Sequence, residues 1–174
     1  GVGSLVSQWA KHLGAIVIGV VSTDEKAELA RAQGCKYIIM ADDIDIPDSV
    51  RKLTGGEGVA AVYDSIGRDT FFASLDSLKP HGTMVTFGNS SGPVDPFAPA
   101  ELAKRGSLYV TRPILFHFVN NREKLLHACD ELFEVVANTA VSIRIGQRYA
   151  LKNVEKAHRD LEARKTTNST ILLP

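Results

Sequence analysis

Apolar positions in the first part of the chain alternate between helical spacing and short extended runs. Leu5, Trp9 and Leu13 recur at the spacing of a helix that Gly14 ends. Residues 15–21 are apolar on both faces, which is typical of a strand covered by helices on each side. The same alternation predicts strands at 37–40, 59–63, 83–87 and 107–111, with helices at 25–33, 47–53, 69–78 and 99–104 between them.

Strands that are separated by helices favour right-handed crossovers and a mostly parallel sheet. A turn is predicted at 79–82, where Pro80 and Gly82 interrupt the apolar pattern. Thr23 and Asp24 are both suited to cap the helix that follows them. The predicted fold class is therefore α/β.

The pattern changes after about residue 118. Residues 122–138 form a long amphipathic helix, residues 141–150 are extended, and Asn153 is expected to cap a helix through Arg164, before a final strand at 170–173. This tail belongs either to the same sheet or to a second, adjoining structure. The residues expected on the buried side of the long helix are Leu125, Leu126, Leu132, Phe133 and Val136.

Composition narrows the class of protein. The length of 174 residues suits a single domain. The 20 Lys and Arg residues balance the 20 Asp and Glu residues, so we expect neither the positive electrostatic field of a nucleic-acid-binding domain nor a polybasic membrane anchor. With 44% hydrophobic and 23% charged residues, a soluble domain with a core is predicted, and no apolar run is long enough to span a bilayer. Cys35 and Cys129 are too few for a disulfide framework and are compatible with a cytoplasmic location.

Residues rich in Gly, Ser and Asn follow the predicted strands. Ligands of open parallel sheets bind beyond the carboxyl ends of the strands, so these segments are candidate binding loops. Turns favour the same residue types, and loop structure alone is the alternative explanation. The segments are 22–26, 64–67, 88–92 and 112–115.

The opening Gly1-Val2-Gly3 precedes a helix, and a glycine turn there presents free N–H groups to a phosphate. Gly3 fits the last glycine of a Gly-x-Gly-x-x-Gly turn, which would place the first strand before residue 1. The alternatives are an ordinary helix start or a cloning remnant.

No carboxylate stands at the end of the predicted strand 15–21, where sites selective for NAD usually have one. Ser22, Thr23 and Lys26 suit a 2′-phosphate, which favours NADP. Asp24 and Glu25 count against this, and Lys26 is otherwise a solvated helix residue.

Metal and nucleophile chemistry are not predicted. The histidines at 12, 81, 117, 127 and 158 are scattered, and neither cysteine has ligand spacing. Ser65 stands in no Gly-x-Ser-x-Gly turn, and Asp64 is interpreted as a strand-end residue that ties down a loop. We therefore expect no catalytic side chain and no metal ligand in this chain.

Several motifs carry a family resemblance that runs in order over residues 1–174. With these motifs, the chain resembles the quinone oxidoreductases, zinc-free members of the medium-chain dehydrogenase/reductase superfamily related to zeta-crystallin. The motifs are Gly1-Val2-Gly3 with Gln8-Trp9-Ala10, then the segments 62–67, 87–92, 111–113 and 157–164, and the terminal Leu172-Leu173-Pro174.

The resemblance implies an NADPH-dependent enzyme that passes hydride to a quinone or a related α,β-unsaturated carbonyl compound. Such transfer needs no protein nucleophile. It also implies a Rossmann-type doubly wound sheet over 1–118 that lacks its first strand, and a segment over 119–174 that rejoins a substrate domain. The chain would then be a fragment of a protein nearly twice as long.

The resemblance assigns each site residue a partner on the cofactor. Gly1 and Val2 would touch the pyrophosphate, and Ser22, Thr23 and Lys26 the 2′-phosphate. Arg164 would reach the adenine end. Residues near the nicotinamide or after the next strand would be Ile66, Phe87, Gly88, Asn89, Ser90, Pro113, Ile114 and Leu115.

The sequence leaves alternatives for cofactor selectivity, for function and for assembly. Relatives often have Tyr where this chain has Ala41, which weakens strict NADP selectivity. A non-catalytic nucleotide-binding module, as a sensor or a crystallin-like structural protein, is the main alternative function, and a methyltransferase-like domain is a weaker one. Residues 107–111 are either an edge strand that pairs two copies into a homodimer or an internal strand.

Overall fold

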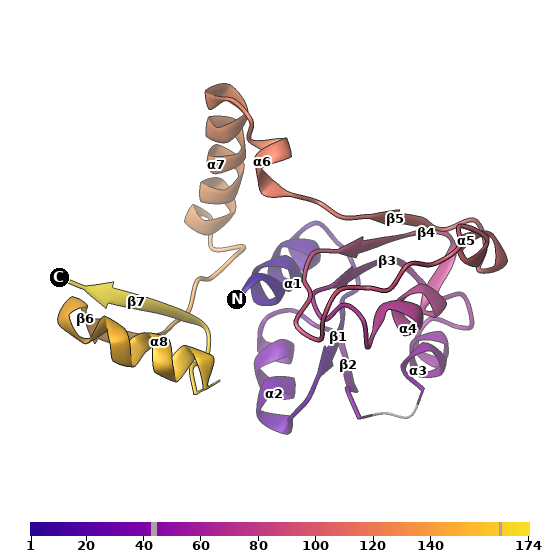
Figure 1. Ribbon diagram of the computed structural model, residues 1–174, viewed down its shortest axis with the longest axis horizontal. Helices are drawn as coiled ribbons and strands as arrows, with labels where there is room; N and C mark the ends of the chain where they lie inside the picture. The colour runs from indigo at the N-terminus through magenta and orange to yellow at the C-terminus, as the bar shows by residue number, and fades with distance from the viewer. Residues whose placement is uncertain (43–44, 164) are drawn as a thin grey trace.

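The computed structural model describes residues 1–42, 45–163 and 165–174. Helices and strands alternate along the chain, and the helices cover the strands (Figure 1). The elements of the first part are α1 (Val2–His12), β1 (Ile18–Val21), α2 (Asp24–Ala32), β2 (Tyr37–Met40), α3 (Ile46–Leu53), β3 (Val59–Asp64), α4 (Phe71–Asp76), β4 (Leu78–Thr86), α5 (Ala100–Lys104) and β5 (Tyr109–Thr111). They are followed by α6 (Leu115–Phe118), α7 (Arg122–Ala137), β6 (Ile145–Ala150), η1 (Leu151–Asn153), α8 (Val154–Glu162) and β7 (Ser169–Leu173).

All strand pairs in the described residues are parallel, as the helical crossovers require, so the predicted α/β class is confirmed. The strands do not form one continuous sheet: β1 pairs with β2, and β3, β4 and β5 form a separate three-stranded sheet in that order. In a Rossmann order of 3-2-1-4-5-6 the first strand separates the second from the fourth. The break between β1 and β3 falls at that place.

The core lies between the three-stranded sheet and the helices beside it. Phe71 and Leu75 of α4 are buried against Leu78, Met84 and Leu108. The Phe71 ring also packs 4.9 Å from the ring of Phe97, measured between centroids. This packing fixes α4, and with it the loop that precedes α4 at the carboxyl end of β3.

Strand β1 is less covered than its apolar sequence predicts. It begins at Ile18, three residues later than expected, and Ile16 and Val20 are 65% and 50% exposed. Its edge opposite β2 has no partner strand in the described residues. The described residues therefore cover this apolar run only in part.

The predicted turn at 79–82 is wrong. Strand β4 begins at Leu78 and continues through these residues, while α4 ends at Asp76. His81 has a φ of 60°, and its N–H donates a hydrogen bond to Gly106 O. The pairing of β4 with β3 shifts in register between Leu78 and Thr83, but the strand does not end there.

The predicted buried face of the long helix is covered only in part: Leu132 and Val136 are half-buried, and the other three residues are exposed. Leu125, Leu126 and Phe133 are 39%, 46% and 64% exposed, whereas Val135 is buried. Figure 1 shows α6 and α7 projecting away from the sheets. Periodicity marked an apolar face correctly, but no element of the described residues covers most of it.

The last elements form a small unit of their own, which lies apart from the other sheets (Figure 1). Strands β6 and β7 pair in parallel, and α8 connects them. Asn153 precedes α8 as predicted, but its side chain makes no cap hydrogen bond. Asp160 of α8 accepts a hydrogen bond from the Tyr149 hydroxyl at 2.8 Å and pairs with Lys156.

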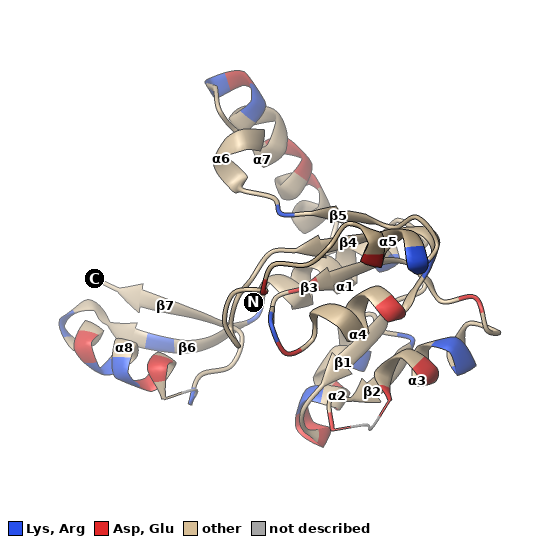
Figure 2. Cartoon of the chain, turned by 45° about the vertical axis from the view of Figure 1, so that its right-hand side comes forward, with Lys and Arg blue, Asp and Glu red and all other residues tan. Residues whose placement is uncertain are grey.

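Charges of both signs alternate over the helices, without a single-sign field (Figure 2). No described helix combines the length and apolar character needed to cross a bilayer. Both cysteines are free, and Cys35 is buried beneath β1. A Cβ placed on Gly19 would lie 2.9 Å from Cys35 Sγ, so the strand passes directly over the thiol.

Candidate cofactor site

The carboxyl ends of β1, β3, β4 and β5 carry the loops in which binding residues are predicted. At the end of β1, the Lys26 ammonium group donates a hydrogen bond to Ser22 Oγ at 2.9 Å. Thr23 caps α2, since its hydroxyl oxygen accepts from the Lys26 N–H at 3.3 Å. The structure thus brings Ser22, Thr23 and Lys26 together, all of them exposed. A cation and two hydroxyl groups thus lie together at the start of α2, although Asp24 and Glu25 place two carboxylates in the same turn.

Asp64 organises the loop after β3, as the sequence predicts. Its carboxylate is buried and accepts from the N–H groups of Ile66 and Gly67, at 2.7 and 3.1 Å. The hydroxyl groups of Thr70 and Ser74 each donate to it at 2.7 Å. Four donors satisfy one buried carboxylate, so the loop is held to α4 and to the strand end.

The loops after β3 and β4 are joined to each other. Ser90 N–H donates to Ser65 O, and Ser91 binds Ile66 O through both its N–H and its hydroxyl group. A Cβ on Gly88 would lie 2.3 Å from Ser65 O, and one on Gly67 would lie 2.5 Å from Gly92 O. The two loops therefore approach to a distance that only glycine permits.

Arg112 connects the loop after β5 to the loop after β4. Its Nη1 donates to Thr86 O at 3.1 Å and to Gly88 O at 3.0 Å. The neighbouring Pro113 is half-buried, and Ile114 and Leu115 are 48% and 68% exposed. The sequence placed Arg112 in a strand-end segment but gave it no role; a charged residue directly after a short strand was the available signal.

The predicted residues fall into three groups. The first consists of Ile66, Phe87, Gly88, Asn89 and Ser90, with Pro113, Ile114 and Leu115 attached through Arg112. The second is Ser22, Thr23 and Lys26, and the third is Gly1, Val2 and Gly3. Among the described residues, no hydrogen bond joins the second or third group to the first. Arg164 lies outside the described residues.

Gly1 to Gly3 occupy the amino end of α1. Gly1 is the N-cap residue and has no side chain to satisfy the first N–H groups, and the first turn contains no acidic residue. Val2 is 57% exposed, and a Cβ on either glycine would meet nothing within 4 Å. The backbone N–H groups of this first turn and the positive end of the helix dipole are groups that suit a phosphate.

A hollow of about 600 Å³ lies at the opposite, amino ends of β3 and β4, and none of the predicted cofactor residues lines it. Among the cations that line it, Lys104 pairs with Glu101. Arg105 donates to Asp76 and to Glu101, each at 2.6 Å, and these bonds raise the pKa of Arg105. The charge of Arg105 is therefore compensated by carboxylates of neighbouring elements.

The profile of the family described as zinc-binding dehydrogenase matches residues 1–132. The chain belongs to the zinc-binding dehydrogenase family. The predicted resemblance to quinone oxidoreductases is confirmed: the chain is 46% identical to a quinone oxidoreductase of Pseudomonas aeruginosa, over all of this chain and 54% of that protein. It is 43% identical to a 2-haloacrylate reductase of a Burkholderia species, over all of this chain and 53% of that protein.

A solved member of this class has the same fold. The structure of Escherichia coli quinone oxidoreductase complexed with NADPH superimposes with a TM-score of 0.91 at 44% identity, over all of this chain and 54% of that one. The Rossmann-type fold is thereby confirmed. The chain spans about half the length of the curated relatives it matches.

The description of this dehydrogenase family names zinc. In the described part of the chain, no three His, Cys, Asp or Glu side chains are grouped so that they could hold a metal ion. The described residues therefore do not form a zinc site.

Proposed function

We propose that the protein is an NADPH-dependent oxidoreductase that transfers hydride to a quinone or a related α,β-unsaturated carbonyl compound, and that this chain is its cofactor-binding part. One observation carries the proposal: the whole chain superimposes on a quinone oxidoreductase complexed with NADPH at 44% identity. The match to a 2-haloacrylate reductase supports extending the acceptor to conjugated alkenes.

The chain's residues suit this cofactor in charge and shape. The exposed amino end of α1, at Gly1, Val2 and Gly3, would hold the pyrophosphate. Ser22, Thr23 and Lys26 would hold the 2′-phosphate through two hydroxyl groups and one cation. Ile66, Phe87, Gly88, Asn89 and Ser90 would line the nicotinamide side, where Asp64 and Arg112 fix the loops.

The bound nicotinamide would supply the hydride, and the chain's own residues would orient it and exclude water. No residue of this chain is proposed to react covalently. Ile114 and Leu115, beyond the end of β5, offer apolar surface beside the loop that Arg112 holds. The alternative function is a non-catalytic nucleotide sensor, which the same fold can also serve. Turnover experiments distinguish the sensor from the enzyme.

We further propose two structural parts: residues 1–118 as the dinucleotide-binding domain and 119–174 as a segment that joins a substrate domain. In the described residues the inner edges of β1 and β3 have no partner strand, which supports a sheet that one more parallel strand completes. The exposed apolar faces of α6 and α7 support a covering element. The free cysteines fit a cytoplasmic location.

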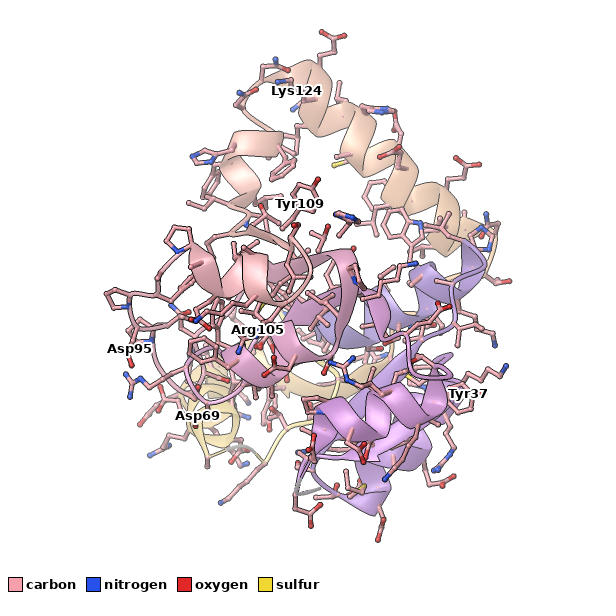
Figure 3. All side chains as sticks on the ribbon, turned by 90° about the vertical axis from the view of Figure 1, so that its right-hand side faces the viewer. Tyr37, Asp69, Asp95, Arg105, Tyr109 and Lys124 are labelled. Carbon is pink, nitrogen blue, oxygen red and sulfur yellow. The ribbon has the colours of Figure 1, made fainter. Side chains whose placement is uncertain are left out.

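A homodimer through β5 is also proposed. In the described residues, strand β5 is an edge of its sheet, and Tyr109, which is labelled in Figure 3, is 61% exposed. Tyr109→Lys places like charges near the two-fold axis and should increase the monomer fraction in sedimentation, whereas Leu13→Lys should not. A purely monomeric unaltered protein would refute the dimer.

The central test is calorimetry with NADPH and NADH on the protein with its natural termini. Tighter binding of NADPH is expected, because only NADPH carries the 2′-phosphate that Lys26 would meet. Loss of reduced-nicotinamide absorbance on adding a quinone would then distinguish an enzyme from a sensor. Equal or undetectable binding of both cofactors would overturn the proposal.

A further inference from the structure

Gln8 of α1 holds the backbone of a residue 134 positions later. Its Nε2 donates to Ser142 O at 3.2 Å, and its Oε1 accepts from the Ser142 N–H at 2.9 Å. A primary amide offers one donor group and one acceptor side by side, which matches the two polar groups of a single peptide residue. The pair of bonds therefore fixes both the distance and the orientation of the backbone at Ser142.

Ser142 lies in the connection between α7 and β6, and this connection is well defined. Thr139 has a φ of 63°, and the Ala140 N–H donates to Asn138 Oδ1 at 3.0 Å. Val141 is 1% exposed, although Ser142 and Ile143 beside it are exposed. Holding Ser142 therefore holds the turn from which β6, α8 and β7 continue.

The same Gln8 amide also reaches the first turn of α1. Its Nε2 lies 3.2 Å from Ser4 O and 3.4 Å from Ser4 Oγ. Because an amide nitrogen carries two hydrogens, the Gln8 side chain can donate hydrogen bonds to Ser4 and to Ser142 at the same time. Ser4 N–H in turn binds Gly1 O at 3.2 Å, so the contact begins at the residues that border the amino end of the helix.

We infer that Gln8 is a positioning residue that couples occupation of the amino end of α1 by a dinucleotide pyrophosphate to the placement of residues 138–142 and of the unit β6–α8–β7. The inference rests on the proposed function, because it requires the cofactor at Gly1 to Gly3. An anion there orders the first turn, Ser4 included, and thereby fixes the amide plane of Gln8. Linkage requires the effect to be reciprocal: holding Ser142 must also favour cofactor binding.

The test uses NADP⁺ as the probe and hydrogen exchange at the Ser142 amide as the readout. In the unaltered protein with its natural termini, saturating NADP⁺ is expected to raise the protection of Ser142 about tenfold. Gln8→Leu removes both bonds at similar volume, so protection should be low and independent of NADP⁺. By reciprocity the Kd for NADP⁺ should rise several-fold. Gln33→Leu at the end of α2 is the matched control and should behave as the unaltered protein.

Gln8→Glu provides an internal switch that needs no comparison of folding between variants. At about pH 8 the introduced carboxylate accepts from Ser142 N–H but donates nothing to Ser142 O, and coupling should be lost. At about pH 4 the protonated carboxyl group regains a donor, and the NADP⁺-dependent protection should return. A residue with a merely structural role would show no such pH profile in its response to NADP⁺.

The outcomes separate the two proposals. If calorimetry detects no NADP⁺ binding to the unaltered protein, the proposed function fails and this inference fails with it. If NADP⁺ binds but Ser142 protection does not respond, or responds equally in Gln8→Leu, only the coupling is overturned and Gln8 is a simple tether.

Discussion

The hydroxyl group of Thr70 donates a hydrogen bond to Asp64 Oδ2 over 2.7 Å, and this bond ties the start of α4 to the buried end of β3. Ser74, one turn further along α4, donates to the same oxygen. The loop that begins the proposed nicotinamide site is thus anchored through Asp64, a residue that is only 5% exposed.

Replacing Asp64 should destabilise the fold more than removing any one of its donors. Asp64→Ala leaves two backbone N–H groups and two hydroxyl groups without their acceptor, and should lower the free energy of unfolding by about 3 kcal/mol or more. Ser74→Ala, which removes one donor, should cost about 1 kcal/mol. Urea unfolding measures both, and equal losses in the two variants would contradict the anchoring role.

The close approach of the loops after β3 and β4 predicts a steric effect at Gly67. Gly67 and Gly55 both have positive φ values, 98° and 66°, but a Cβ meets Gly92 O at 2.5 Å only at Gly67. Gly55→Ala should cost about 1 kcal/mol for backbone strain alone, whereas Gly67→Ala should cost about 3 kcal/mol.

Thermal unfolding with and without NADPH checks this pair. Gly67→Ala should also weaken NADPH binding, because the loops must separate, while Gly55→Ala should leave the Kd unchanged. Similar stabilities of the two variants would show that the loops after β3 and β4 can move apart without lowering the free energy of unfolding.

Lys26 should distinguish the two nicotinamide cofactors. Its ammonium group lies beside Ser22 Oγ at the carboxyl end of β1, so Lys26→Ala should raise the Kd for NADPH about tenfold and leave that for NADH nearly unchanged. Lys124→Ala, at the start of α7, is the control and should affect neither. A parallel loss for both cofactors would show that Lys26 does not meet the 2′-phosphate.

The unit β6–α8–β7 should lose stability in acid. Hydrogen bonds from Lys156 and then Tyr149 lower the pKa of Asp160 from its ordinary value of 3.8. A lowered pKa in the folded state gives stability that is complete above 3.8 and is lost as the pH falls through the folded value. The hydrogen bond to Asp160 also raises the pKa of Tyr149 above its ordinary 10.0, so that contribution is present below 10.0 and lost above the raised value.

Hydrogen exchange of α8 against pH tests this assignment. Asp160→Asn should remove the acid-dependent loss, while Glu155→Gln, which alters only an exposed pair with Arg159, should keep it. An unchanged acid profile in Asp160→Asn would assign the loss to another group.

Local rules predicted much of the fold. Tyr37–Met40 is the strand expected from its apolar run, and Thr23 caps α2 because a hydroxyl side chain can bind the N–H groups of a first turn. The strand through Pro80 and His81 was missed, because its pairing with β3, which shifts in register there, is not encoded in the local pattern. Burial of Phe133 was mispredicted for a related reason: periodicity marks an apolar face but does not identify its partner.

In the candidate site, too, local features are predicted from the sequence, whereas contacts between distant segments are not. Asp64 was interpreted correctly as a loop anchor from its place after a strand, but its partners Thr70 and Ser74 become evident only when the turn of α4 is in place. The contacts of Gln8 with Ser142 and of Arg112 with Gly88 each join distant segments, and no local spacing encodes them.

The passage of β1 over Cys35 makes this thiol a natural kinetic reporter. Gly19 leaves just enough room for the sulfur atom, and the thiol is 6% exposed, so a bulky alkylating reagent reaches it only when β1 lifts away from α1 and α2. The rate of Cys35 alkylation then measures how often the β1–β2 sheet opens, while the less buried Cys129 on α7 reports separately on the other end of the chain.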